Sequence, residues 1–353
     1  MIRLIQQNIF LVIIIVVLII VIATYVVNTD KKKSEETAVR EFYALGTIIR
    51  LRVDGKNGEE AIQEAIDRLN IIENKMSVFK EFSEVSMINK NAGISSQEVS
   101  TDTYFVVKKA VEYSILSEGT FDPTIRSIVS LWRIGSDNPR IPSKSEIESN
   151  LKLVNYEDIV LDEKNHSISL KHVNQAIDVG GIAKGYAADE VKKVFEGYKI
   201  KSALIDLGGN IYALGTKPDK NLWNVGIQNP FDTRGEHIGI IGVENKSIVT
   251  SGNYERYFTR EGKIYHHIID PKTGYPSESE VISSTIISDH SIDGDGLSTG
   301  VYIMGLEKSI KLIESLKGID AIFITKNKEI YVTSGIKNSF NITNTEFIYK
   351  DNL

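Results

Sequence analysis

The sequence predicts an α+β protein in which one folded domain follows a single N-terminal membrane helix. Two observations lead to this prediction. Residues 9–27 are almost entirely Ile, Val and Leu, whereas from Val39 onward helical and strand patterns alternate without a long linker. The chain has 353 residues, of which 42% are hydrophobic and 25% charged, a composition typical of a globular protein.

The apolar run of residues 9–27 predicts a transmembrane anchor. At 1.5 Å per residue it spans about 28 Å, close to the hydrocarbon thickness of a bilayer. It is longer than the apolar core of a signal peptide, and no small-x-small cleavage site follows, so we expect it to stay uncleaved. A cleavable signal peptide and a buried core helix are the alternatives. Residues 1–8 would then flank the anchor, residues 28–38 form a polar tether, and residues 39–350 form the domain.

Net charge and cysteine content exclude several classes of protein. The net charge is -6, from 41 basic and 47 acidic residues, which argues against a nucleic-acid-binding protein. The chain has no cysteine, so disulfides, thiolate metal sites, a cysteine nucleophile and a lipidated N-terminal cysteine are all excluded. Lysines 31–33 follow the apolar run and Arg3 precedes it, a distribution that weakly favours a cytoplasmic domain.

Local patterns predict the regular elements of the domain. Ile62, Ala65 and Leu69 recur at helical spacing, so residues 59–76 should form an amphipathic helix. Further helices are expected at 101–117, with Thr101 or Asp102 as the N-cap, and at 182–195 and 306–316. β-rich segments predict strands at 47–53 and 202–207, and a hairpin of strands 321–325 and 329–333.

Two glycine-containing segments have a structural and a functional interpretation. Gly119 to Pro123 has the composition of a turn after a helix. Residues 178–186 (DVGGIAKGY) place glycines before a helix, where backbone N–H groups can approach a phosphate, although tight helix packing needs the same glycines. The segment matches neither a Walker A motif nor G-x-G-x-x-G.

Two further segments contain side chains suited to proton transfer and metal binding. His266 and His267 are adjacent, and on a strand they would point to opposite faces, so only one can line a given pocket. Asp295 and Thr299 are four residues apart, which places both on one face of a helix and offers Mg²⁺ hard oxygen ligands. An Asp N-cap on a buried helix is the alternative for Asp295. Together the four segments indicate phosphoryl or nucleotidyl transfer.

In this order the motifs of the chain resemble those of the ApbE family, the FAD:protein FMN transferases. The resemblance covers nearly the whole domain. It runs through ALGT (44–47), MSVF (76–79), GTFD (119–122), DVGGIAKGYAAD (178–189), LGGN (207–210), WNVGIQNP (223–230), TSG (250–252), HIIDPKTG (267–274) and the segment from Asp295 to Thr299. Membership would imply a single T-fold-related catalytic domain.

The resemblance implies an activity and a set of site residues. Such enzymes split FAD with Mg²⁺, attach FMN through a phosphoester to a Thr or Ser of an acceptor protein, and release AMP. His267 matches the residue that activates the acceptor hydroxyl. The metal positions correspond to Gly181, Asp295, Ser298 and Thr299. The FAD-contacting positions correspond to Leu45, Phe79, Thr120, Phe121, Asp122, Asp178, Lys184 and Ile269.

Two positions depart from the family pattern, and they leave alternatives open. Leu45 stands where Met is usual, and Phe79 stands where many members have Tyr beside the isoalloxazine ring, so a hydroxyl is lost there. An FAD pyrophosphatase with the same site and a non-catalytic flavin-binding protein are the rival interpretations. The family also implies an extracytoplasmic domain at the cell membrane, with a membrane-associated electron carrier as acceptor and no nucleic-acid partner.

Overall fold

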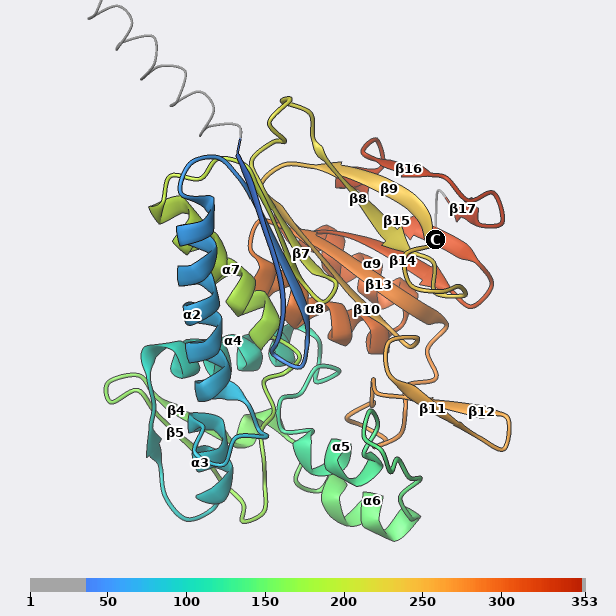
Figure 1. The fold of residues 1–353 in the computed structure, drawn as a ribbon. Helices are drawn as coiled ribbons and strands as arrows, with labels where there is room; N and C mark the ends of the chain where they lie inside the picture. Colours follow the sequence, from blue (N-terminus) through green and yellow to red (C-terminus); the bar gives the residue numbers. More distant parts are fainter. Residues whose placement is uncertain (1–35, 351–353) are drawn as a thin grey trace, which may run out of the picture.

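The structure, a computed structural model, describes residues 36–350 and is organised around a nine-stranded sheet (Figure 1). Neighbouring strands are antiparallel, except that β15 and β17 are parallel. In spatial order the strands are β1 (Thr37–Ala44), β2 (Thr47–Asp54), β6 (Ala203–Leu207), β7 (Asn210–Leu214), β10 (Lys246–Gly252), β13 (Val281–Ser288), β14 (Asp320–Thr325), β15 (Glu329–Val332) and β17 (Ile348–Lys350).

Helices cover one face of this sheet (Figure 1). They are α2 (Gly58–Met76), α4 (Thr101–Leu116), α7 (Ala183–Gly197), α8 (Ser291–Met304) and α9 (Leu306–Ser315). Ala61, Ile62, Ala65, Leu69 and Ile72 of α2 are fully buried, because their spacing places them on the one helical face that meets the sheet. This layer holds the main hydrophobic core.

A small three-stranded sheet covers the opposite face of the large one. It contains β8 (Trp223–Gln228), β9 (His237–Val243) and β16 (Phe340–Ile342), and η2 (Ser334–Ile336) precedes β16. Strand β14 shows why the large sheet is buried on both sides. Ala321 and Phe323 pack into the helical core, whereas Ile322 and Ile324 pack into the second core.

A group of shorter elements extends below the helical layer in Figure 1. It comprises α3 (Glu84–Lys90), β3 (Gln97–Glu98), α5 (Arg126–Trp132), α6 (Lys144–Leu151), η1 (Tyr156–Asp158), β4 (Ile159–Asp162), β5 (Ser167–Leu170), β11 (Tyr257–Arg260) and β12 (Lys263–His266). Ile128, Trp132, Ile147 and Ile269 form a satellite core there, and it joins α5 and α6 to the loop that follows β12.

The α+β class and the locally predicted helices and strands are confirmed, with differences at their ends. Ser100, and not Thr101 or Asp102, is the N-cap of α4, since its hydroxyl accepts the N–H of Thr103. Strand β1 begins at Thr37, so the last two residues of the predicted tether belong to the sheet. No strand directly precedes the glycine segment, where Ala176 forms only an isolated bridge with Ile125.

The predicted anchor, residues 9–27, its flank, residues 1–8, and most of the tether lie outside the described residues. Within residues 36–350 no helix is both long enough and apolar enough to cross a bilayer.

Candidate functional site

Close packing of α7 on α8 forms the base of the candidate site. A Cβ atom on Gly185 would lie 2.4 Å from the Ser291 carbonyl oxygen and 2.7 Å from the Asp295 Cβ, so only glycine permits this approach. The Gly185 N–H donates to Asp295 Oδ2 at 2.9 Å. Asp189 accepts the N–H groups of Ser291 and Ile292, and thereby caps α8 from another helix.

Oxygen atoms gather beside this contact. The Ser251 hydroxyl lies 2.9 Å from the Ser298 hydroxyl and 3.1 Å from the Thr299 hydroxyl, so β10 fixes both side chains of α8. Lys184 Nζ lies 3.5 Å from Asp295 Oδ1 and 3.4 Å from the Gly180 carbonyl oxygen. An ammonium group between a carboxylate and a carbonyl marks a position where positive charge is favoured.

This donor set fits Mg²⁺ better than a transition metal. Among the described residues no group of three or more His, Asp or Glu side chains could hold a metal. The side-chain ligands that the cluster offers are one carboxylate, Asp295, and the hydroxyls of Ser298 and Thr299. Mg²⁺ commonly uses one or two protein carboxylates and completes its shell with water and substrate phosphate.

The segment that precedes α7 brings several predicted residues to the same place. Asp178 accepts the Gly180 N–H at 2.9 Å, and its other oxygen lies 3.3 Å from Arg126 Nη1. A Cβ atom on Gly181 would lie 3.1 Å from the Phe121 ring, so the backbone there passes directly over that buried side chain. The segment therefore links Asp178 and Phe121 to Lys184 and Asp295.

His266 and His267 point in different directions, as their alternation on the strand predicts. His266 is buried, with Nε2 3.1 Å from the Ser277 carbonyl oxygen and its ring against Tyr302. His267 extends the β11–β12 ladder, because its N–H donates to the Arg256 carbonyl at 3.0 Å. His266 is therefore a packing residue, and His267 is the one available to a ligand.

The imidazole of His267 has the protonation state that a base requires. Burial, and after it the positive charge of Arg256, lowers the pKa of His267 to about 4. The Nδ1 atom lies 3.2 Å from the Arg256 carbonyl oxygen, which can only accept, so Nδ1 carries the proton. Nε2 is therefore left with a free lone pair at neutral pH.

The β1–β2 hairpin reaches the same region. Its turn consists of Leu45 and Gly46, both with positive φ (52° and 71°), a conformation that is uncommon for leucine. The Leu45 N–H donates to Glu73 Oε2 at 3.1 Å, and Arg256 Nη2 lies 3.5 Å from the Gly46 carbonyl oxygen. Arg256 thus connects the predicted flavin contact Leu45 to the loop that holds His267.

The side chains of three other predicted FAD contacts are hydrogen-bonded or packed within the protein. The Thr120 hydroxyl lies 2.8 Å from the carbonyl oxygens of both Ser117 and Gly300. Asp122 is buried and accepts hydrogen bonds from the backbone and hydroxyl of Thr124 and from the Tyr156 N–H. These contacts confirm the turn interpretation of residues 119–123. Ile269 packs in the satellite core, and a role for any of the three in FAD binding stays a prediction.

Three residues that organise the site are not among the site residues predicted from the sequence. Ser251 orients the hydroxyls of α8, Arg256 holds His267 and the β1–β2 turn, and Arg126 pairs with Asp178. Ser251 lies within a motif of the resemblance, but its partners are 47 and 48 residues away. Such long-range contacts leave no local signal in the sequence.

Comparison with known proteins identifies the family. The ApbE family model matches residues 45–323. The FAD:protein FMN transferase of Treponema pallidum (strain Nichols) is 33% identical over 86% of this chain and 89% of its own length. The protein of the same name from Klebsiella pneumoniae (strain 342) is 37% identical over 74% of this chain and 81% of its own length.

Solved structures agree with the sequence matches. The ApbE protein of Thermotoga maritima has a TM-score of 0.79 with 32% identity, and the flavin transferase ApbE of Vibrio cholerae has a TM-score of 0.78 with 27% identity. Each comparison covers 86% of this chain and 99% of the other. The chain therefore belongs to the ApbE family. It is an enzyme of the transferase class, as are its curated relatives by name.

Proposed function

We propose that the chain is a Mg²⁺-dependent FAD:protein FMN transferase. It would cleave FAD, attach FMN through a phosphoester to a Thr or Ser of an acceptor protein, and release AMP. The observation that supports the proposal is the contact of Lys184 Nζ with Asp295 Oδ1 at 3.5 Å, on the helix whose Ser298 and Thr299 hydroxyls are held by Ser251. A cation and an oxygen cluster thus lie together, and His267 would supply the base.

The protein's own groups account for the proton transfer in this reaction. The acceptor hydroxyl oxygen forms a bond to the FMN phosphorus, and the bond from that phosphorus to the bridging oxygen breaks. AMP leaves with the bridging oxygen, while the hydroxyl proton passes to Nε2 of His267. Nδ1 donates to the Arg256 carbonyl and holds the ring in place throughout. The Lys184 ammonium offsets negative charge on the diphosphate.

Asp295, Ser298, Thr299 and the Gly181 carbonyl are the groups that would hold Mg²⁺. When bound, the ion would neutralise charge on the diphosphate and make AMP a better leaving group. The hydrogen bonds from Gly185 to Asp295 and from Ser251 to the two hydroxyls fix these oxygens in advance.

We also propose that residues 9–27 anchor the enzyme in the cell membrane, with the domain outside the cytoplasm and a membrane-associated electron carrier as acceptor. Strand β1 starts at Thr37, so only a short polar tether separates the apolar run from the sheet. Protease treatment of intact cells tests the topology: digestion of the domain supports it, and protection until lysis contradicts it.

Flavin transfer can be tested with full-length protein in detergent, FAD and Mg²⁺. The acceptor source is a membrane extract of the source organism from which the gene for this chain has been deleted. We expect a fluorescent flavin band that survives denaturing electrophoresis, with AMP release. His267→Ala should give no band. Free FMN and AMP without a band would indicate a pyrophosphatase, and bound FAD without AMP would indicate a flavin-binding protein.

A further inference from the structure

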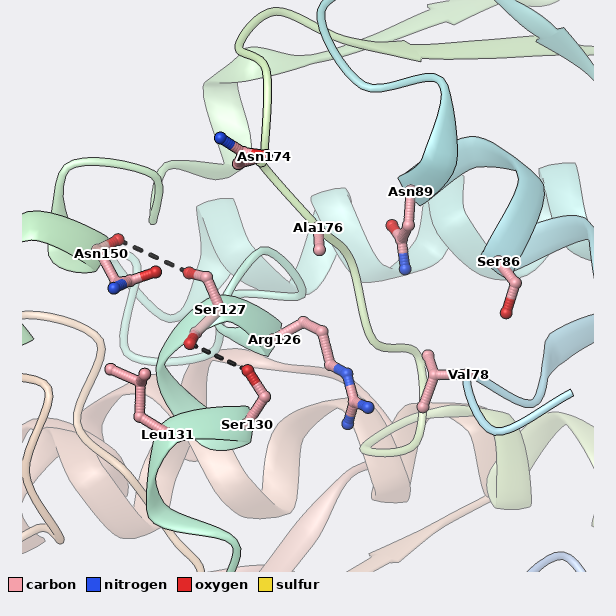
Figure 2. Close-up of a pocket in the computed structure, with 10 residues that line it drawn as sticks. All are labelled: Val78, Ser86, Asn89, Arg126, Ser127, Ser130, Leu131, Asn150, Asn174 and Ala176. Carbon is pink, nitrogen blue, oxygen red and sulfur yellow. Dashed lines mark hydrogen bonds between the residues drawn. The ribbon is translucent and has the colours of Figure 1, made fainter. Parts of the chain in front are cut away.

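A hollow of about 550 Å³ lies between the β8–β9 loop and residues 254–257, where β11 begins, and no step of the proposed reaction uses it. Phe231, Asp232 and Arg234 of the loop and Tyr254, Glu255 and Tyr257 of the facing segment are among its lining residues. The hollow drawn in Figure 2, about 410 Å³, is a different one. It is lined by Arg126, which pairs with Asp178 and so belongs to the site already described.

One wall of the larger hollow adjoins the strand that carries Ser251. A Cβ atom on Gly252 would lie 2.3 Å from the Tyr254 ring, so this ring packs directly against the last residue of β10. Side chains alternate along a strand, and Ser251 contacts the hydroxyls of α8 whereas Gly252 faces Tyr254. The hollow therefore lies across the end of β10 from the oxygen cluster.

The same wall continues to the predicted base. Glu255 and Tyr257 flank Arg256, whose carbonyl oxygen accepts the His267 N–H at 3.0 Å. Paired strands lie roughly 5 Å apart, and an extended chain advances about 3.3 Å per residue, so about two residues of an extended segment lead from the hollow to His267. A polypeptide seated in the hollow can thus present a neighbouring hydroxyl to the base.

The charges of the hollow suit a polypeptide better than a nucleotide. Asp232 and Glu255 are negative and Arg234 is positive, and none of the three forms an ion pair with any residue that the structure describes. Two carboxylates against one guanidinium repel a negatively charged diphosphate. A peptide backbone is neutral, and it offers carbonyl oxygens to the guanidinium and N–H groups to the carboxylates.

Two exposed aromatic rings give the hollow an apolar part. Phe231 is 47% exposed and Tyr257 is 52% exposed, and they belong to the two segments that face each other across it. Phe231 is held by the Phe347 ring, 6.1 Å away, and by the Lys328 ammonium, 5.5 Å from its ring centre. Aromatic side chains held in this way are typical anchors of protein–protein interfaces.

The proposed reaction also needs a binding site separate from that of the nucleotide. In phosphoryl transfer the attacking and leaving oxygens lie roughly in line, so the acceptor hydroxyl must approach from the side opposite to AMP. The positively charged Lys184 and the oxygen cluster lie on the α7–α8 side of β10, and the hollow lies across the end of that strand.

We propose that this hollow is the docking site for an extended segment of the acceptor protein, next to its modified Thr or Ser. An apolar side chain of the segment lies between Phe231 and Tyr257, and Arg234 donates to its backbone carbonyls. The inference rests on the proposed function, and it adds the place where the protein substrate binds.

Steady-state transfer to a purified acceptor tests the proposal. The acceptor of the flavin band, purified unmodified from the strain that lacks the gene for this chain, is titrated against the full-length enzyme with FAD and Mg²⁺. We expect Phe231→Ser to raise the KM for the acceptor about tenfold, and Arg234→Gln about threefold, with kcat changed less than about twofold. The Kd for FAD, measured by calorimetry without acceptor, should not change. Arg234 is exposed, so its replacement tests the hollow without disturbing packing.

Phe105→Ser and Arg50→Gln are the matched controls. Phe105 of α4 is 40% exposed and has the Tyr186 ring 5.8 Å away, and Arg50 of β2 is exposed; neither lines the hollow. Both controls should leave the KM for the acceptor and the Kd for FAD unchanged.

Three results would overturn the docking site while the proposed function stands. They are an unchanged KM for the acceptor in Phe231→Ser and Arg234→Gln, an equal rise in the controls, and a parallel loss of FAD affinity, which would assign the hollow to the nucleotide. If wild-type protein labels no acceptor at all, the proposed function itself fails and the docking site with it.

Discussion

The pH dependence of the wild-type enzyme tests whether His267 acts as the base. Burial, followed by the charge of Arg256, lowers the pKa of His267 to about 4. With that pKa about 90% of the imidazole is neutral at pH 5, whereas an ordinary pKa of about 6.5 would leave about 3% neutral. The ratio of kcat/KM at pH 5 to kcat/KM at pH 8 should therefore be about thirtyfold larger than the ratio expected for a histidine with an unperturbed pKa.

The assay measures AMP release at low FAD concentration from pH 8 down to pH 4. A plateau that ends near pH 4 to 5 agrees with the structure, and a midpoint near 6.5 would refute the reasoning. Arg256→Gln keeps the backbone carbonyl but removes the charge, so it should move the midpoint to higher pH. A histidine pKa lowered by folding also makes the protein less stable as pH falls below about 6.5, so thermal unfolding must be followed at each pH.

Three substitutions test the supports of the oxygen cluster. Asp295→Asn removes the charge but can still accept the Gly185 N–H, so titration should show at least about a tenfold loss of Mg²⁺ affinity with little change in melting temperature; unchanged affinity would exclude Asp295 as a ligand. Gly185→Ala should lower the free energy of unfolding by about 1–3 kcal/mol in denaturant unfolding. Gly197→Ala is the control, because Gly197 lies in the same helix with no atom near its Cβ position, and this change should be neutral or stabilising. Equal effects of the two changes would contradict the packing argument. Ser251→Ala should raise the Mg²⁺ concentration needed for half-maximal rate by several-fold, because Thr299 loses its partner, and an unchanged requirement would show that Ser251 does not orient the ligands.

Local patterns in the sequence were sufficient for the regular elements. The spacing of Ile62, Ala65 and Leu69 predicts α2, and these three residues are fully buried. The alternation of His266 and His267 correctly predicts one packing residue and one accessible residue. The four-residue spacing of Asp295 and Thr299 places both on α8, although neither caps it.

The sequence could not decide between the packing and the phosphate-binding interpretation of the glycine segment, residues 178–186, because its glycines meet both requirements. Gly185 is required by the contact of α7 with α8, which is the packing interpretation, while Gly180 and Gly181 lie beside Asp178 and Lys184, where a phosphate could approach. Only the position of α8, more than 100 residues further along the chain, separates the two causes.

Most of the contacts that could not be predicted from the sequence join residues far apart along the chain. Asp189 caps α8 across 102 and 103 residues, and Arg126 meets Asp178 across 52. Neither residue type nor neighbours indicate these pairings, because an aspartate inside a helix and an arginine at the start of one are ordinary solvent-facing residues. The resemblance located the motifs, but it did not explain what holds their side chains in place.

Intact-mass spectrometry of an acceptor protein purified from the flavin band tests the central claim most directly. The account expects the acceptor to gain the mass of FMN less one water on a single Thr or Ser, in a reaction that requires FAD, Mg²⁺ and His267. An acceptor of unchanged mass, while FAD is converted to free FMN and AMP, would contradict it.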